Sequence, residues 1–168
     1  MYSVNAGSQA IADLHGRPLG ARALEKRGLI LAATRALLEE RGLREIRVAD
    51  IARAVDTSPA TFYQYFSAVE HVALHLAAEL NSEIPALLEL FDGMWRGKEG
   101  QRRAFEVVNF FFDYWDRRGP ILRIRNLAAE EGDVRFMALR RDAMEPVLAA
   151  MEALMRRNTV GSKDPLID

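Results

Sequence analysis

The sequence contains no cysteine, very little lysine and no long hydrophobic run. Without cysteine, disulfides, thiolate nucleophiles and cysteine-ligated zinc are excluded for all 168 residues. No apolar run approaches the roughly 18–20 residues that a membrane-spanning helix needs. Residues 1–20 also lack the apolar core and cleavage site of a signal peptide. We therefore expect a soluble cytoplasmic protein with no membrane partner.

Positive and negative charges nearly cancel, since 23 Lys and Arg face 24 Asp and Glu. Residues 1–66 hold nine basic and seven acidic side chains (net +2), and residues 67–168 hold fourteen and seventeen (net −3). A polyanion partner would therefore bind the N-terminal third. The chain has twenty Arg and three Lys, and the planar guanidinium group of Arg suits phosphates and base edges. A genome-wide codon bias is the more common reason for such a ratio.

Hydrophobic periodicity predicts helices along the whole chain, and no segment alternates as a strand does. The expected fold is all-α, with an N-terminal three-helix helix-turn-helix domain and a C-terminal helical domain for ligand binding and dimerisation. Helices are predicted over 21–41, 48–55, 59–66, 69–90, 102–117, 121–131 and 133–157. Pro85 and Pro146 should bend their helices, and Gly119-Pro120 should end one. The expected domains are an arm (1–20), the helix-turn-helix (21–67), the second domain (68–157) and a disordered tail (158–168).

The most informative stretch runs from Val48 to Phe66. Apolar residues at 48, 51, 52 and 55 give one buried face to a short helix. Ser58 followed by Pro59 is a strong start signal, because serine caps a free N–H and proline at the first helical position has none to lose. Two short helices joined by so tight a turn are typical of a helix-turn-helix, whose second helix enters the major groove.

The second of these helices has two distinct faces. Phe62 and Phe66 are four residues apart and should anchor it to the core, contributing roughly 3–6 kcal/mol. The candidate DNA-binding residues on and around the other face are Arg47, Ser58, Pro59, Ala60, Thr61, Tyr63, Gln64 and Tyr65. Small and hydroxylated side chains can approach base edges, glutamine can pair with adenine, and tyrosine hydroxyls can hold phosphates. The alternative is a plain helical hairpin with exposed tyrosines.

Three segments, at 28–42, 48–52 and 58–66, resemble the N-terminal domain of TetR-type transcriptional repressors. The most specific part is Thr-Phe-Tyr-x-Tyr-Phe at 61–66. The resemblance implies that Pro59, Ala60, Thr61, Tyr63 and Tyr65 contact a double-stranded DNA operator, with the two phenylalanines buried. It also implies a C-terminal domain that binds a small-molecule effector and forms a homodimer.

The chain departs from the family pattern at four places. Arg47 stands where Ser or Thr usually caps the first of the two helices, but it could reach a phosphate directly. Asp56 replaces the glycine of the turn, and Asp tolerates a left-handed backbone better than most residues. Val69 replaces a lysine, so one phosphate contact is missing. Only residues 158–168 follow the last long helix, where the family usually has a further helix pair that often makes the dimer. The chain is then truncated, dimerises by other surfaces, or is a monomer.

Aromatic residues crowd the second half of the chain. Phe110, Phe111 and Phe112 cannot all point into one core, so some should line a pocket or an interface. The candidate ligand-binding residues are Trp95, Phe105, Asn109, Phe112, Trp115, Arg123 and Asn126. They suggest a mainly apolar ligand with an acidic group that meets Arg123. Core packing is the alternative for Phe105, Phe112 and Trp115.

Signals for metal binding or catalysis are weak. His71, His75 and Glu79 share one helix stripe that could bind zinc, but ordinary surface histidines are the better interpretation because no second ligand helix is evident. No metal, other cofactor or catalytic residue is predicted, since phosphate loops and nucleophile motifs are lacking. The sequence thus favours a repressor released by a ligand. The alternatives are a helical interaction module that has lost operator binding and, with least support, a metal-dependent enzyme.

Overall fold

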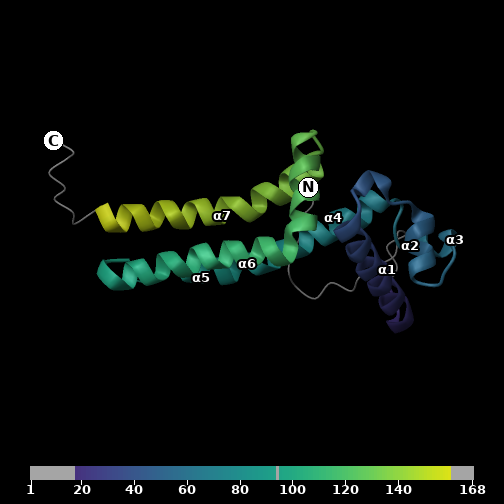
Figure 1. The fold of residues 1–168 in the computed structure, drawn as a ribbon, viewed down its shortest axis with the longest axis horizontal. Coiled ribbons are helices and arrows are strands. Elements are labelled where there is room, and N and C mark those ends of the chain that lie inside the picture. Colours follow the sequence, from purple (N-terminus) through teal and green to yellow (C-terminus); the bar gives the residue numbers. More distant parts are fainter. Residues whose placement is uncertain (1–17, 94, 160–168) are drawn as a thin grey trace. The chain divides into compact units, whose positions relative to one another are not determined.

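The computed structural model describes residues 18–93 and 95–159, and every regular element in them is a helix (Figure 1). The all-α prediction is confirmed. The chain divides into two compact units that meet between Leu76 and Ala77, inside helix α4. We call them the N-terminal unit and the C-terminal unit. In the part of the chain that is described, no helix is long and apolar enough to cross a membrane.

The N-terminal unit is built from short helices on a longer one. Its elements are α1 (Ala21–Glu40), the 3-10 turn η1 (Leu43–Glu45), α2 (Val48–Ala54), α3 (Pro59–Phe62) and most of α4 (Val69–Glu79). Ile30, Ile51, Phe62, Phe66 and Val72 are almost wholly buried in its core. Helices of one or two turns are unstable alone, so this shared core holds α2 and α3 in place.

The C-terminal unit holds η2 (Leu80–Glu83), α5 (Ile84–Leu90), α6 (Gly97–Glu130) and α7 (Val134–Thr159). Helix α7 runs back alongside α6 (Figure 1). Leu87, Phe91, Ala143 and Val147 form the buried centre between α5 and α7, and Phe110 of α6 packs against it.

Most predicted helices are confirmed, with boundary shifts. The predicted 59–66 helix is helical only to Phe62 and continues as turns. The predicted interruption near Pro85 is present, because α4 ends at Glu79 and α5 begins at Ile84 after a 3-10 turn. The predicted loop at 93–100 is shorter, since α6 starts at Gly97. The predicted tail (158–168) lies mostly outside the described residues, as does nearly all of the predicted arm.

The predicted helix end at Gly119-Pro120 is wrong. Helix α6 continues through Pro120, and Figure 1 shows that it changes direction along its length. An internal proline removes one hydrogen bond, and its ring crowds the residue before it. That residue is Gly119, which has no side chain to clash, and burial of Ile121 and Leu122 offsets the lost bond.

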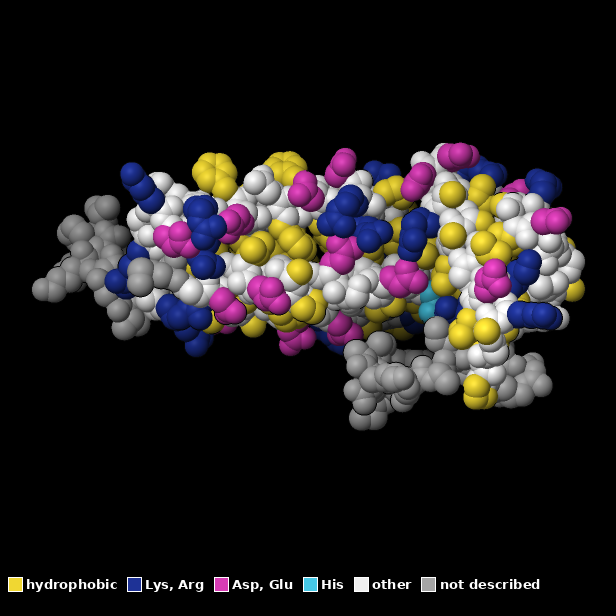
Figure 2. Space-filling view, turned by 90° about the horizontal axis from the view of Figure 1, so that it is seen from below, with side chains coloured by type: hydrophobic (Ala, Val, Ile, Leu, Met, Phe, Trp, Pro, Cys, Tyr) yellow, Lys and Arg dark blue, Asp and Glu magenta, His cyan; other side chains and the backbone are white. Residues whose placement is uncertain are grey.

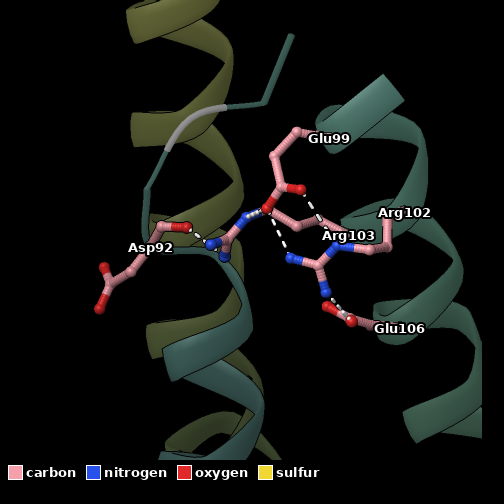
Figure 3. A network of polar contacts seen from close by, with 5 residues as sticks. All are labelled: Asp92, Glu99, Arg102, Arg103 and Glu106. Atoms are coloured by element: carbon pink, nitrogen blue, oxygen red, sulfur yellow. Dashed lines mark hydrogen bonds and ion pairs between the residues drawn. The ribbon is translucent and has the colours of Figure 1, made fainter. Parts of the chain in front are cut away.

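A network of charged side chains fastens the start of α6 (Figure 3). Arg103 donates to the main-chain carbonyl of Asp92 at 2.6 Å and to Glu99 at 3.0 Å. Arg102 bonds both Glu99 and Glu106. The hydrogen bond from Arg102 is the main reason that the pKa of Glu99 is lowered. The network connects the loop after α5 to the first turns of α6.

Candidate nucleic-acid interface

The turn between α2 and α3 sets the direction of the second helix. Asp56 has a φ of 46°, so the backbone is left-handed at this position, as the comparison with the family's glycine suggested. The N–H of Thr57 donates to the carbonyl of Ala52 at 2.9 Å and closes the turn. Non-glycine residues adopt this conformation at a cost that Asp bears better than most.

Ser58 caps α3, as predicted. Its Oγ accepts a hydrogen bond from the N–H of Thr61 at 3.2 Å, and Pro59 occupies the first helical position. The hydroxyl of Thr61 lies 3.1 Å from the same Oγ. Both hydroxyls are thus engaged within the cap, which fixes the start of α3.

The two phenylalanines turn inward, also as predicted. Phe62 and Phe66 are buried, with ring centroids 5.9 Å apart. Phe66 is further enclosed by Arg27, whose guanidinium carbon lies 5.0 Å from its ring centroid, and by the His75 ring at 5.5 Å. This cluster fixes the rotation of the α3 segment about its own axis.

The opposite face of the α3 segment is open to solvent. Pro59, Ala60, Tyr63 and Gln64 are exposed, and Tyr63 keeps 52% of its surface accessible while its ring meets Phe62 edge-on. Tyr65 is half-buried. No charged residue occurs between 58 and 66. The segment therefore presents hydrogen-bonding and apolar groups suited to base edges.

Basic side chains flank α2. Arg47 precedes it, is exposed and makes no side-chain cap, so the predicted loss of a Ser or Thr cap is confirmed. Its N–H is satisfied by Asp50, whose carboxylate accepts at 3.0 Å. Arg53, at the other end of α2, has a 79% exposed side chain and lies 3.5 Å from Asp50. The sequence analysis missed Arg53, although its place on the α2 face away from Ile51 and Ala52 indicated exposure.

The two histidines of α4 make protein contacts. Nδ1 of His71 lies 2.5 Å from Ser67 Oγ, and Nδ1 of His75 lies 3.2 Å from a guanidinium nitrogen of Arg27. Burial, then the charges of Arg27 and His71, lower the pKa of His75. Within the described ranges, no group of three His, Cys, Asp or Glu is placed to hold a metal ion.

The predicted effector residues do not line one cavity. Phe105, Asn109, Phe112, Trp115 and Arg123 are exposed along α6, Asn126 is half-buried, and Trp95 stacks on Phe91 with centroids 6.0 Å apart. Core packing of Phe105, Phe112 and Trp115 is wrong, because α6 turns its Val107, Phe110 and Tyr114 face inward instead. A groove of about 510 Å³ lies between α5 and α7, and none of these seven residues lines it.

A polar cluster inside the C-terminal unit escaped the sequence analysis. Arg125 is only 5% exposed, and no described Asp or Glu forms an ion pair with it. Tyr114 donates to the carbonyl of Leu80 at 3.2 Å and also shares a side-chain hydrogen bond with Arg125, whose Nε lies 3.4 Å from Oδ1 of Asn126. Burial is the main reason that the pKa of Arg125 is lowered. Asn81 donates to the carbonyl of Leu139, while its Oδ1 is buried without a partner in the described structure. The available signal was that Arg125 shares a helix stripe with Ile121, Leu122 and Ala129.

Family models match both units. The model of bacterial regulatory proteins of the tetR family matches residues 30–76, and that of the tetracyclin repressor-like C-terminal domain matches residues 87–165. Together they cover about three quarters of the chain. No curated protein matches the chain significantly.

Proposed function

The chain belongs to the TetR family of bacterial regulatory proteins, and from this premise we propose that it represses transcription as a homodimer and leaves its operator when a small effector binds. Its domains are those of a DNA-binding transcriptional regulator. The observation that carries the proposal is the two-sided α3 segment, with Phe62 and Phe66 buried and Tyr63 exposed.

The α3 segment supplies the proposed sequence-reading contacts. Ala60 can meet a thymine methyl group, Gln64 can pair with adenine, and the hydroxyl of Tyr63 can donate to a phosphate. Exposed Arg47 and Arg53 would hold the backbone on either side of α2. Ser58 and Thr61 contribute mainly by fixing the start of the helix, because their hydroxyls already face each other.

A pair of neighbouring substitutions tests this orientation. Tyr63→Phe removes one exposed hydroxyl and should weaken operator binding about 5- to 10-fold, the value of one hydrogen bond, with little change in melting temperature. Phe62→Ala opens a cavity in the core and should destabilise the N-terminal unit by about 3–5 kcal/mol. If instead Tyr63→Phe unfolds the protein while Phe62→Ala is silent, the proposed orientation of α3 is wrong.

A gel-shift series against genomic fragments at two salt concentrations separates repressor from interaction module. A specific operator complex should survive competitor DNA, because base contacts add to the phosphate contacts. Binding that competitor or moderate salt removes entirely would be phosphate binding alone and would favour the helical interaction module.

The effector site that the C-terminal unit supports best surrounds Arg125. A buried guanidinium without a carboxylate carries a desolvation cost that an acidic ligand group would offset. Its nearest neighbours on the same stripe of α6, Ile121, Leu122 and Ala129, are apolar and buried. We therefore assign the acidic group to Arg125 in place of the exposed Arg123, and the ligand body remains mainly apolar. Such a ligand acts by favouring a state that does not bind the operator.

Benzoate and decanoate serve as probes of this site. Either acid should raise the melting temperature of the wild type, and Arg125→Met should abolish the increase while preserving the side-chain volume. Arg123→Met is the matched control, because Arg123 is exposed and lies two residues away on the same helix. Equal stabilisation of wild type and Arg125→Met would overturn the assignment without affecting the DNA-binding proposal.

A further inference from the structure

The carboxylate of Asp50 lies among three arginines of the N-terminal unit. Its Oδ2 accepts a hydrogen bond from the main-chain N–H of Arg47 at 3.0 Å and lies 3.8 Å from Nη1 of Arg41. Its Oδ1 lies 3.5 Å from Nη1 of Arg53. Arg41 follows α1, Arg47 precedes α2, and Arg53 lies in the last turn of α2. Asp50 therefore connects the end of α1 with both ends of α2.

The contacts of Asp50 with the two guanidinium groups differ from its contact with the main chain. The hydrogen bond from Arg47 closes the first turn of α2 and is structural. The distances to Arg41 and Arg53 are longer than the roughly 2.7–2.9 Å of an oriented, charge-assisted hydrogen bond. The side chain of Arg53 is 79% exposed, and that of Asp50 is 20% exposed. The carboxylate thus offsets the charge of both guanidinium groups without fixing their direction.

The balance of charge around α2 matters because the α3 segment has no charged residue of its own. Figure 2 shows acidic and basic side chains interspersed on the face drawn there. Affinity for DNA phosphates comes mainly from Lys and Arg side chains that neutralise them and release counterions. An arginine that is paired with a carboxylate must first give up that pair, and the carboxylate itself repels the phosphates.

We propose that Asp50 is a positioning residue that limits binding to DNA phosphates by holding the charges of Arg41 and Arg53 in ion pairs. Exposed ion pairs are weak, so a phosphate within reach displaces the carboxylate, but at a cost that every DNA sequence meets. Because a genome offers a large excess of unrelated DNA, this cost keeps more of the protein available for its operator. The proposal rests on the proposed DNA-binding function, since DNA is the polyanion concerned.

Asp50→Asn tests the role of the charge. The amide oxygen of asparagine can still accept from the N–H of Arg47, so the melting temperature should change little. In titrations at equal salt with duplex DNA of mixed sequence, the variant should bind about 3- to 10-fold more tightly than the wild type, the value of one or two exposed ion pairs.

Glu39→Gln is the matched control for Asp50→Asn. It removes the same charge from an exposed position near the end of α1 and should leave the affinity for the mixed-sequence duplex nearly unchanged. Unchanged or weaker binding by Asp50→Asn, or equal tightening by both variants, would overturn the proposal. Equal tightening would show that the net charge of the unit, and not the pairing of arginines, sets the affinity.

A double-mutant cycle tests whether Asp50 acts through Arg53. Arg53→Gln should weaken binding to the mixed-sequence duplex in the wild type and about 3-fold more in the Asp50→Asn background, because Arg53 is no longer paired there. Equal losses in both backgrounds would refute the proposal. A purely structural role of Asp50 would lower the melting temperature and leave no such coupling.

These titrations need no operator sequence, so they separate the role of Asp50 from the proposed repressor function. If no specific operator complex forms, the repressor proposal fails, while tighter binding of unrelated duplex by Asp50→Asn would still support the role of Asp50. If neither the wild type nor Asp50→Asn binds the mixed-sequence duplex at low salt, the role of Asp50 is refuted as well.

Discussion

At the residue scale, the contact between Arg27 and His75 makes the N-terminal unit sensitive to pH. Nδ1 of His75 accepts from Arg27, and burial, Arg27 and His71 hold the His75 pKa below its usual 6.5. As pH falls below about 6.5, the unfolded chain takes up a proton before the folded chain does. This contribution to stability is complete above that pH and is lost as pH falls through the lower folded pKa.

Thermal unfolding at several pH values between 7.5 and 5 measures this contribution. We expect the wild type to lose stability across this range, and His75→Gln to lose less, because glutamine can still accept from Arg27 but does not titrate. The carboxyl groups with shifted pKa, Glu99 and Asp133, are shifted downward and titrate at lower pH. Identical pH profiles for wild type and variant would rule out His75 as the source.

Residues whose roles are local could be predicted from the sequence. The Ser58 cap, the burial of Phe62 and Phe66 and the left-handed Asp56 each depend on neighbours within a few positions. Arg125 could not be predicted, because its burial arises from elements distant in the sequence. Periodicity marks which positions are buried but does not overcome the expectation that arginine is exposed.

At the element scale, two helical glycines should respond oppositely to alanine. A Cβ at Gly28, inside α1, would meet nothing within 4 Å, whereas a Cβ at Gly100 would lie 2.6 Å from the main-chain carbon of Trp95. Gly28→Ala should therefore stabilise the protein by about 0.5–1 kcal/mol through helix propensity. Gly100→Ala should destabilise it by about 1–3 kcal/mol through overpacking.

Urea unfolding followed by circular dichroism compares the two variants directly. Because the substitution is chemically the same, the difference in sign isolates the close approach of the loop to the first turn of α6. A Gly100→Ala variant as stable as Gly28→Ala would show that this loop moves aside at little cost.

The sequence predicted the two halves of helix α6 but not their continuity. The pattern correctly indicated helix on both sides of Gly119-Pro120, but a proline and a glycine together normally end a helix. Their order decides the outcome here, since the glycine relieves the crowding that proline imposes on the preceding residue. Phe105, Phe112 and Trp115 were singled out as candidates, but the sequence did not show which side of α6 meets the core, because aromatic residues occur on both.

At the scale of the whole molecule, the proposed homodimer predicts how operator binding depends on the number of half-sites. Each helix-turn-helix reads only a few base pairs, and coupling two of them raises the local concentration of the second at its half-site. Binding to a two-half-site operator should therefore be about 10²-fold or more tighter than binding to one half-site, while binding to unrelated DNA is weak and salt-sensitive. Titrations at equal salt measure all three, and equal affinity for one and two half-sites would contradict the coupling.

Both tryptophans of the chain, Trp95 and Trp115, belong to the C-terminal unit, and the described part of the N-terminal unit has tyrosine as its near-ultraviolet absorber. Selectively excited indole fluorescence therefore reports on one unit without any added dye. Trp115 is 49% exposed on α6, so its emission should shift to the blue if rising protein concentration buries this face by self-association, whereas Trp95, stacked on Phe91, supplies a steady background. Intrinsic tryptophan fluorescence can therefore report self-association of the C-terminal unit.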